Sequence, residues 1–197
     1  VKKNEKKLIL RDDITMQISR LSLSRLFEKN RPLKLCYYGE VVRKKGSMLR
    51  PERQFLQIGA ECIGEKNILA DVEMMELAFS SLSLVGIKNI SIEISSRIFL
   101  DKFYFSIRNS KNIDEIRRLI KLKDLKAALN LLNTKNRNHL KNIFSCTGNY
   151  FEKEKKLDKL KIGKISINEI KNIKNIIKIF YKNNKKVKIF LDLCEID

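Results

Sequence analysis

Two β-type runs joined by a short basic loop constrain this sequence more than any other feature. The runs cover residues 35–43 and 52–63, and the loop between them, residues 44–51, contains Gly46 and Ser47, which favour turns. Neighbouring runs joined by a short loop pair as antiparallel strands, whereas a parallel pair needs a long crossover. The sequence therefore predicts a β-hairpin with a cationic tip.

The second run has two unlike faces. By the two-residue period of a strand, Gln57 and Glu61 lie on one face, together with Phe55. On a covered face, a Gln and a Glu cost free energy unless they have polar partners, which a ligand with an ammonium and an imidazole would supply. The alternative is that the polar face is open to solvent on a half-buried strand. The opposite face carries small and apolar side chains: Leu56, Ile58, Ala60 and Cys62.

Four motifs resemble those of the histidyl-tRNA synthetase family, which has a class II synthetase fold. They are residues 10–15 (LRDDIT), 38–43 (YGEVVR, which matches motif 2), 53–64 (RQFLQIGAECIG) and 70–73 (ADVE), in the order of the family. The chain resembles even more closely a catalytically silent paralogue within that family, the regulatory subunit of ATP phosphoribosyltransferase in histidine biosynthesis.

The resemblance implies a histidine-binding site. The positions that match the family's histidine-binding residues are Asp13, Thr15, Gln57 and Glu61, and Arg43 would lie near the histidine carboxylate or a nearby phosphate. The chemistry fits, because carboxylates pair with an ammonium group and a guanidinium holds an anion through two hydrogen bonds. Alternatively, Asp13 and Thr15 are ordinary residues of a helix N-terminus, and Arg43 is an exposed cation at a strand end.

One departure from the motifs distinguishes a histidyl-tRNA synthetase from the regulatory subunit. Motif 2 of a synthetase reads Arg-x-Glu, and the Glu helps to bind the adenine ring, whereas this chain has Arg43-Lys44-Lys45. The charge reversal at Lys45 argues against adenylate formation. We therefore expect a regulatory subunit without catalytic residues or cofactor, which the short catalytic subunit needs for activity and for feedback inhibition by histidine. The alternative is a catalytic-core fragment of a histidyl-tRNA synthetase.

The amino-acid composition indicates which kinds of partner the protein binds. The formal net charge is +19 over 197 residues, which attracts polyanions without specificity. The basic residues are mostly Lys, whereas a nucleic-acid binder more often shows Arg and aromatics gathered into one patch, so we expect no specific nucleic acid. No apolar run is long enough to span a membrane, and the N-terminus is unlike a signal peptide. The four cysteines are scattered and His139 is the single histidine, so we expect no metal site. We expect a cytoplasmic protein that forms a hetero-oligomer with the catalytic subunit and also self-associates.

The order of elements predicts an α+β fold, in which an antiparallel sheet is flanked by helices as in a class II synthetase core. The periodicity predicts a strand over residues 7–11, a helix from Ile14, a second helix over 68–84 and a strand over 88–95. We divide the chain into a core (1–96), a small helical insert (97–165) and a return to the core (166–197), with Ser166 as a helix N-cap and a strand over 187–193. From the family's motifs, we expect an interior fragment that lacks motif 1 and motif 3.

Overall fold

The computed structural model describes residues 9–46, 48, 51–160 and 164–195. The chain forms two compact units, residues 1–74 and 75–197. Each unit is described by itself. The boundary falls within a helix, whereas the predicted division into core, insert and return follows the architecture of the family. That division stays a prediction.

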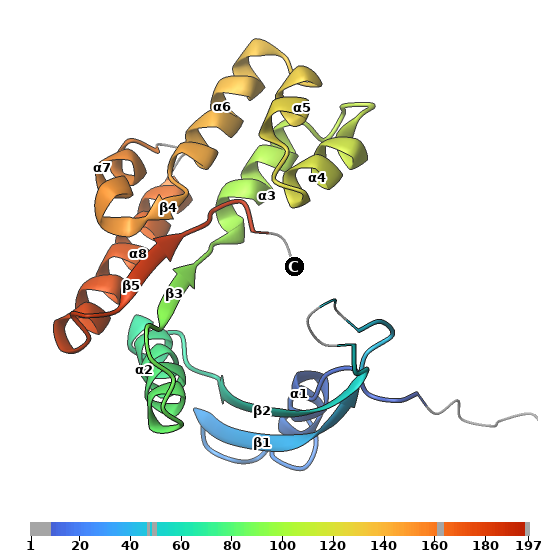
Figure 1. Cartoon of the computed structure of the whole chain (residues 1–197), viewed down its shortest axis with the longest axis vertical. Helices are drawn as coiled ribbons and strands as arrows, with labels where there is room; N and C mark the ends of the chain where they lie inside the picture. Colours follow the sequence, from blue (N-terminus) through green and yellow to red (C-terminus); the bar gives the residue numbers. More distant parts are fainter. Residues whose placement is uncertain (1–8, 47, 49–50, 161–163, 196–197) are drawn as a thin grey trace, which may run out of the picture. The chain divides into compact units, whose positions relative to one another are not determined.

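The first unit is built on the predicted hairpin. After α1 (Thr15–Ser22), strands β1 (Leu33–Val42) and β2 (Gln54–Ile63) pair antiparallel from Leu33 opposite Ile63 to Val42 opposite Gln54 (Figure 1). The hairpin prediction is confirmed, although Ser47 of its loop lies outside the described residues. The unit ends in the first part of α2 (Ile68–Leu84), where Glu73 accepts a hydrogen bond of 2.6 Å from Lys34.

The structure shows which face of the hairpin is covered, and the result contradicts the alternative of an exposed polar face. Gln57 and Glu61 lie on the partly buried face, which contacts α1. The apolar face is the open one, since Ile58 is 77% exposed and Tyr38, opposite it, is 76% exposed. The alternative that the polar face is solvent-exposed is therefore wrong within this unit, because Ile14 and Thr15 at the start of α1 supply polar partners to Gln57 and Glu61.

The second unit contains a small mixed sheet. Strand β5 (Lys188–Leu191) pairs parallel with β3 (Ser91–Ile94) and antiparallel with the two-residue strand β4 (Gly148–Asn149), in the order β3-β5-β4. The prediction of an antiparallel sheet thus holds for the hairpin but is wrong for β3. About ninety residues of helical chain separate β3 from β5, and such a crossover permits parallel pairing.

Several helices lie between β3 and β5 along the chain. They are α3 (Arg97–Ser106), α4 (Ile113–Lys121), α5 (Leu125–Asn130), α6 (Thr134–Ser145), α7 (Tyr150–Lys159) and α8 (Lys164–Asn183). Helix α3 contacts α6 and α8, and Phe99 and Phe103 of α3 and Phe180 of α8 are completely buried. Phe103 lies 5.6 Å from Tyr104 and 5.5 Å from His139 between ring centroids.

Several elements differ from the predictions. The first helix begins at Thr15 and stops at Ser22, and residues 9–11 are not a strand, while residues 7 and 8 lie outside the described part. Gly148, with a φ of +123°, separates α6 from α7 within the predicted helical insert. Ser166 is not an N-cap, because α8 begins at Lys164; its buried hydroxyl accepts a hydrogen bond of 2.8 Å from Lys102.

The helix over 68–84 has the predicted bounds, and Gly86 follows it with a φ of +83°. Within the described part of the chain, no helix combines the length and the apolar character needed to cross a membrane.

Candidate functional site

Thr15 is the centre of a polar network in the first unit. Its hydroxyl donates a hydrogen bond of 2.9 Å to Glu61 Oε1 and lies 3.3 Å from the hydroxyl of Tyr37. Thr15 can reach both because it is the first residue of α1, and α1 contacts the partly buried face of the hairpin. A residue near the N-terminus and two strand residues far along the chain thus meet through one hydroxyl group.

Asp13 and Gln57 extend this network at the start of α1. Asp13 accepts hydrogen bonds from the backbone N–H of Thr15 (2.5 Å) and from Gln57 Nε2 (3.2 Å), and the amide oxygen of Gln57 accepts one from the backbone N–H of Ile14 (3.2 Å). Asp13 therefore does what a helix N-terminal residue does, as the plainer alternative held, and also binds the strand. We call Asp13, Thr15, Tyr37, Gln57 and Glu61 the polar network.

The hydrogen bonds favour the charged form of Asp13. The bond from Gln57, followed by those from Thr15, lowers the pKa of the Asp13 carboxyl below its ordinary value of 3.8, with a smaller contribution from the positive charge of Arg43. Asp13 is thus a carboxylate at neutral pH. Together with Glu61, it gives the network two acceptors for a cationic group.

Arg43 lies at the edge of the network rather than within it. It follows β1 directly, is exposed, and lies over the Phe55 ring at 5.2 Å from the guanidinium carbon to the centroid. Arg43 lines a cavity of about 510 Å³ with Asp12, Asp13, Lys44 and Lys45. This cavity joins carboxylates and cations in one place, so that a zwitterion would find a partner for each of its charges.

The structure adds Tyr37 and two glycines to the predicted site. Tyr37 faces Gly59 across the hairpin, and a Cβ atom on Gly59 would overlap its ring. A Cβ on Gly39 would lie 2.5 Å from the guanidinium of Arg11, which donates a hydrogen bond of 2.6 Å to the carbonyl of Glu40. Alternation along β1 places Tyr37 on one face with Gly39, but only the register shows that this is the face of Gln57 and Glu61.

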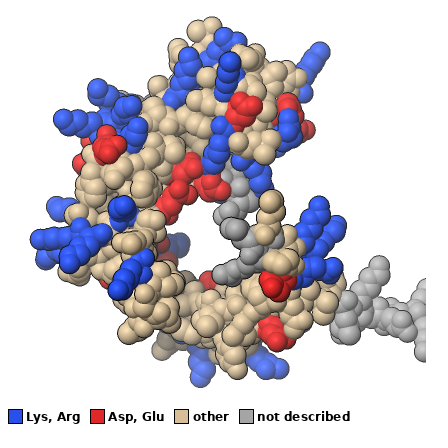
Figure 2. All heavy atoms as spheres, in the orientation of Figure 1, with Lys and Arg blue, Asp and Glu red and all other residues tan. Residues whose placement is uncertain are grey.

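A group of carboxylates in the second unit has the chemistry of a cation site. Single oxygens of Glu93, Asp192 and Glu195 lie within 4.8 Å of one another, and Figure 2 shows acidic side chains gathered in this unit. The ammonium of Lys123 lies 2.6 Å from Asp192 and 2.7 Å from Glu195. Burial disfavours this ammonium, but its two hydrogen bonds raise the pKa of Lys123. Lys123 therefore already supplies the positive charge that these carboxylates require.

The chain matches one family of proteins over its whole length. The family model described as histidyl-tRNA synthetase matches residues 1–197, and the chain belongs to this family.

Within the family, the chain is similar to proteins described as regulatory subunits. The chain is 38% identical over 120 residues to the ATP phosphoribosyltransferase regulatory subunit of Rhodospirillum rubrum, a match that covers 60% of this chain and 31% of the relative. The chain thus spans about a third of the length of this curated relative.

Two solved structures share the fold. A Bacillus halodurans protein described as an ATP phosphoribosyltransferase regulatory subunit/histidyl-tRNA synthetase superposes with a TM-score of 0.78 at 23% identity, over 94% of this chain and 50% of that one. A chain of the HisG:HisZ ATP phosphoribosyl transferase complex from Thermotoga maritima gives a TM-score of 0.70 at 15% identity, over 98% and 71% of the two chains. At these identities, the likeness supports the class II synthetase-like α+β fold.

Proposed function

We propose that this chain is part of a non-catalytic regulatory subunit of ATP phosphoribosyltransferase in histidine biosynthesis. It activates a short-form catalytic subunit, with which it forms a cytoplasmic hetero-oligomer, and it transmits feedback inhibition by histidine. The chain resembles a protein described as a regulatory subunit and a chain of an ATP phosphoribosyl transferase complex, and this resemblance supports a regulatory function. The observation that carries the role of histidine is the polar network beside Arg43.

In this proposal, the network holds the histidine zwitterion. Asp13 and Glu61 accept hydrogen bonds from the α-ammonium and the imidazole, and Thr15 and Gln57 keep these two carboxylates in place through the bonds that they already make. Arg43 meets the histidine carboxylate. Histidine shifts the complex toward a less active arrangement only if it binds that arrangement more tightly than the active one, since equal affinity would shift nothing.

A histidyl-tRNA synthetase is the second candidate, since that is the description of the family model that matches the chain. Lys45 argues against it. This residue stands where a synthetase has the Glu that contacts adenine, and it lines the same cavity as Arg43 and Lys44. Three adjacent cations leave no acceptor for the adenine amino group at that position.

Formation of phosphoribosyl-ATP by a short-form catalytic subunit separates the two candidates. We expect the complete protein to activate this reaction and histidine to reverse the activation. Absence of activation, combined with histidine-dependent exchange of pyrophosphate into ATP by the protein alone, would identify a synthetase instead.

Paired glutamine variants test the histidine site. Gln57→Ala removes the side chain that holds Asp13, and we expect the histidine concentration for half-inhibition to rise about tenfold, the usual effect of losing a hydrogen bond to a charged group. Gln54→Ala is the matched control, because Gln54 lies on the same strand but its amide donates to Glu40 at 2.9 Å. Equal histidine sensitivity of the two variants would refute the assignment.

A further inference from the structure

A cavity in the second unit carries an excess of positive charge. It has a volume of about 640 Å³ and lies between α3 and α4. Such a volume is within the range of small-molecule sites, about 300–1,000 Å³. Five of its nine lining residues are cationic and one is acidic: Arg97, Arg108, Arg117, Arg118 and Lys121, with Asp101.

Aromatic rings hold two of these cations. The guanidinium of Arg108 lies 4.1 Å from the centroid of Phe105 and donates a hydrogen bond of 3.1 Å to the backbone carbonyl of the same residue. The guanidinium of Arg117 lies 5.1 Å from the centroid of Tyr104. A stacked guanidinium is restricted in orientation, so less freedom is lost when its N–H groups bind an anion.

The cations that line the cavity differ in how closely carboxylates pair with them. Arg118 is fully engaged by Glu115 at 2.6 Å, while Arg97 and Arg117 make only long ion pairs of 3.7 Å with exposed carboxylates. Among the described residues, no carboxylate forms an ion pair with Arg108 or Lys121. Weak pairs at the surface contribute little and are readily exchanged for a stronger anion. The cavity therefore keeps free capacity for negative charge.

The remaining lining side chains are apolar or neutral. Phe105 is 67% exposed although it is a large aromatic residue, and Ile113 also faces the cavity. Burial raises the pKa of Tyr104 to about 12, so that its hydroxyl stays neutral and adds no negative charge. The cavity offers cations for a charged group and apolar surface for an attached ring or sugar.

We propose that this cavity binds a small molecule carrying a di- or triphosphate group. Guanidinium forks match phosphate oxygens in geometry and number, and several are needed to balance three or four negative charges. The volume suits a nucleotide or free pyrophosphate rather than a polymer. This proposal does not rest on the histidine site, which lies on residues of the other unit.

Calorimetric titration of the 197-residue chain with sodium pyrophosphate and with ATP, at about 0.15 M salt to suppress long-range attraction, tests this proposal. We expect binding at a single site, and we expect Arg108→Ala and Arg117→Ala each to weaken it about tenfold. Arg117→Lys keeps the charge but loses the fork, so it should restore affinity only in part. Thermal unfolding of each variant establishes that it is folded.

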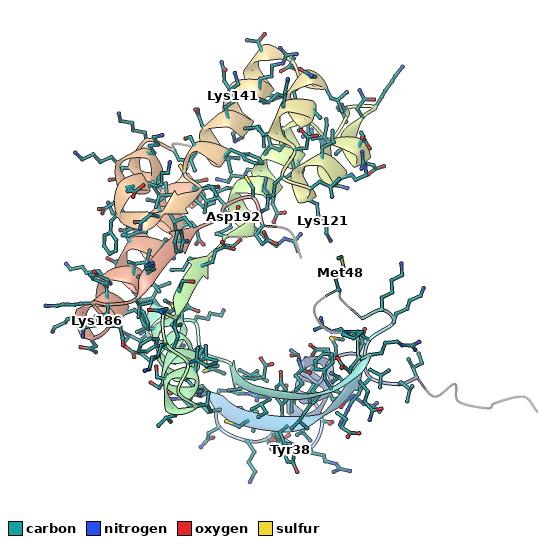
Figure 3. All side chains as sticks on the ribbon, viewed as in Figure 1. Tyr38, Met48, Lys121, Lys141, Lys186 and Asp192 are labelled. Carbon is teal, nitrogen blue, oxygen red and sulfur yellow. The ribbon has the colours of Figure 1, made fainter. Side chains whose placement is uncertain are left out.

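Lys141→Ala is the control for overall charge. It removes the same charge from α6, outside the cavity, whereas Lys121 at the end of α4 lines it (Figure 3). We expect Lys141→Ala to change the affinity less than twofold. The proposal fails if this control weakens binding as much as Arg117→Ala, or if neither ligand binds at millimolar concentration. It also fails if a short RNA binds through Arg117 while neither pyrophosphate nor ATP competes with it, since the surface would then serve nucleic acid.

Discussion

The two compact units of this chain are stabilised by different interactions. In the first, the described residues with buried apolar side chains are few, namely Ile14, Leu33, Val41 and Val72, and hydrogen bonds of the hairpin and the polar network supply much of the remaining order. In the second, large side chains from several helices and from β5 form a continuous core. The unit with the smaller core thus carries the proposed histidine site, where polar groups must stay available to a ligand. The unit with the larger core can tolerate exposed arginines around a cavity.

The largest expected effect comes from the core of the second unit. Phe103→Ala should lower the free energy of unfolding by about 3–5 kcal/mol, because Phe103 is completely buried and its loss leaves a cavity. Phe105→Ala, two residues further along the same helix, should change it by less than about 0.5 kcal/mol, since Phe105 is largely exposed. Urea unfolding measures both. Similar losses for the two variants would mean that this core does not dominate the stability of its unit.

A smaller loss of unfolding free energy is expected when a buried side chain of the hairpin is truncated. Val41→Ala should cost about 2 kcal/mol, because Val41 is completely buried against its neighbours. Ile58→Ala on the open face should cost less than about 0.5 kcal/mol in the same urea experiment. If Ile58→Ala costs as much as Val41→Ala, the apolar face of the hairpin is covered in solution and the contrast between the two units is weaker than described.

The smallest effect concerns protonation of the polar network. The folded-state pKa of Asp13 is lowered, so its carboxylate stabilises the fold above the ordinary pKa of 3.8, and this contribution is lost as the pH falls through the lowered value. Gln57→Ala should move the pKa of Asp13 upward toward 3.8, as measured by the carboxyl carbon shift in an NMR titration. Gln54→Ala should leave it in place. An unchanged pKa in Gln57→Ala would show that Gln57 does not hold this carboxylate.

Much of the first unit could be predicted because its signals are local. Alternation and turn residues predict the hairpin, and helical spacing predicts the second helix, whose first part closes this unit. Alternation also separates the face of Gln57 and Glu61 from that of Leu56 and Ile58, but it does not indicate which face the chain covers. That depends on where residues 11–15 lie, which is a tertiary contact without a local pattern.

The second unit was harder to predict for a related reason. A strand such as β3 carries no mark of whether its partner runs parallel or antiparallel, and a strand of two residues, such as β4, is too short for a periodic pattern. For the site, the motif resemblance brought Asp13, Thr15, Gln57 and Glu61 to attention, and the structure places them in one network. Tyr37 was missed because its neighbours across the strands become known only with the register.

The close approach of Tyr37 to Gly59 has a consequence for how this hairpin can change in evolution. A Cβ atom at position 59 overlaps the aromatic ring, so a substitution there requires the ring to shift or the tyrosine to be replaced. Either change moves or removes the hydroxyl group that lies beside Thr15. The two positions are therefore coupled, and a larger residue at 59 arises only together with a changed site.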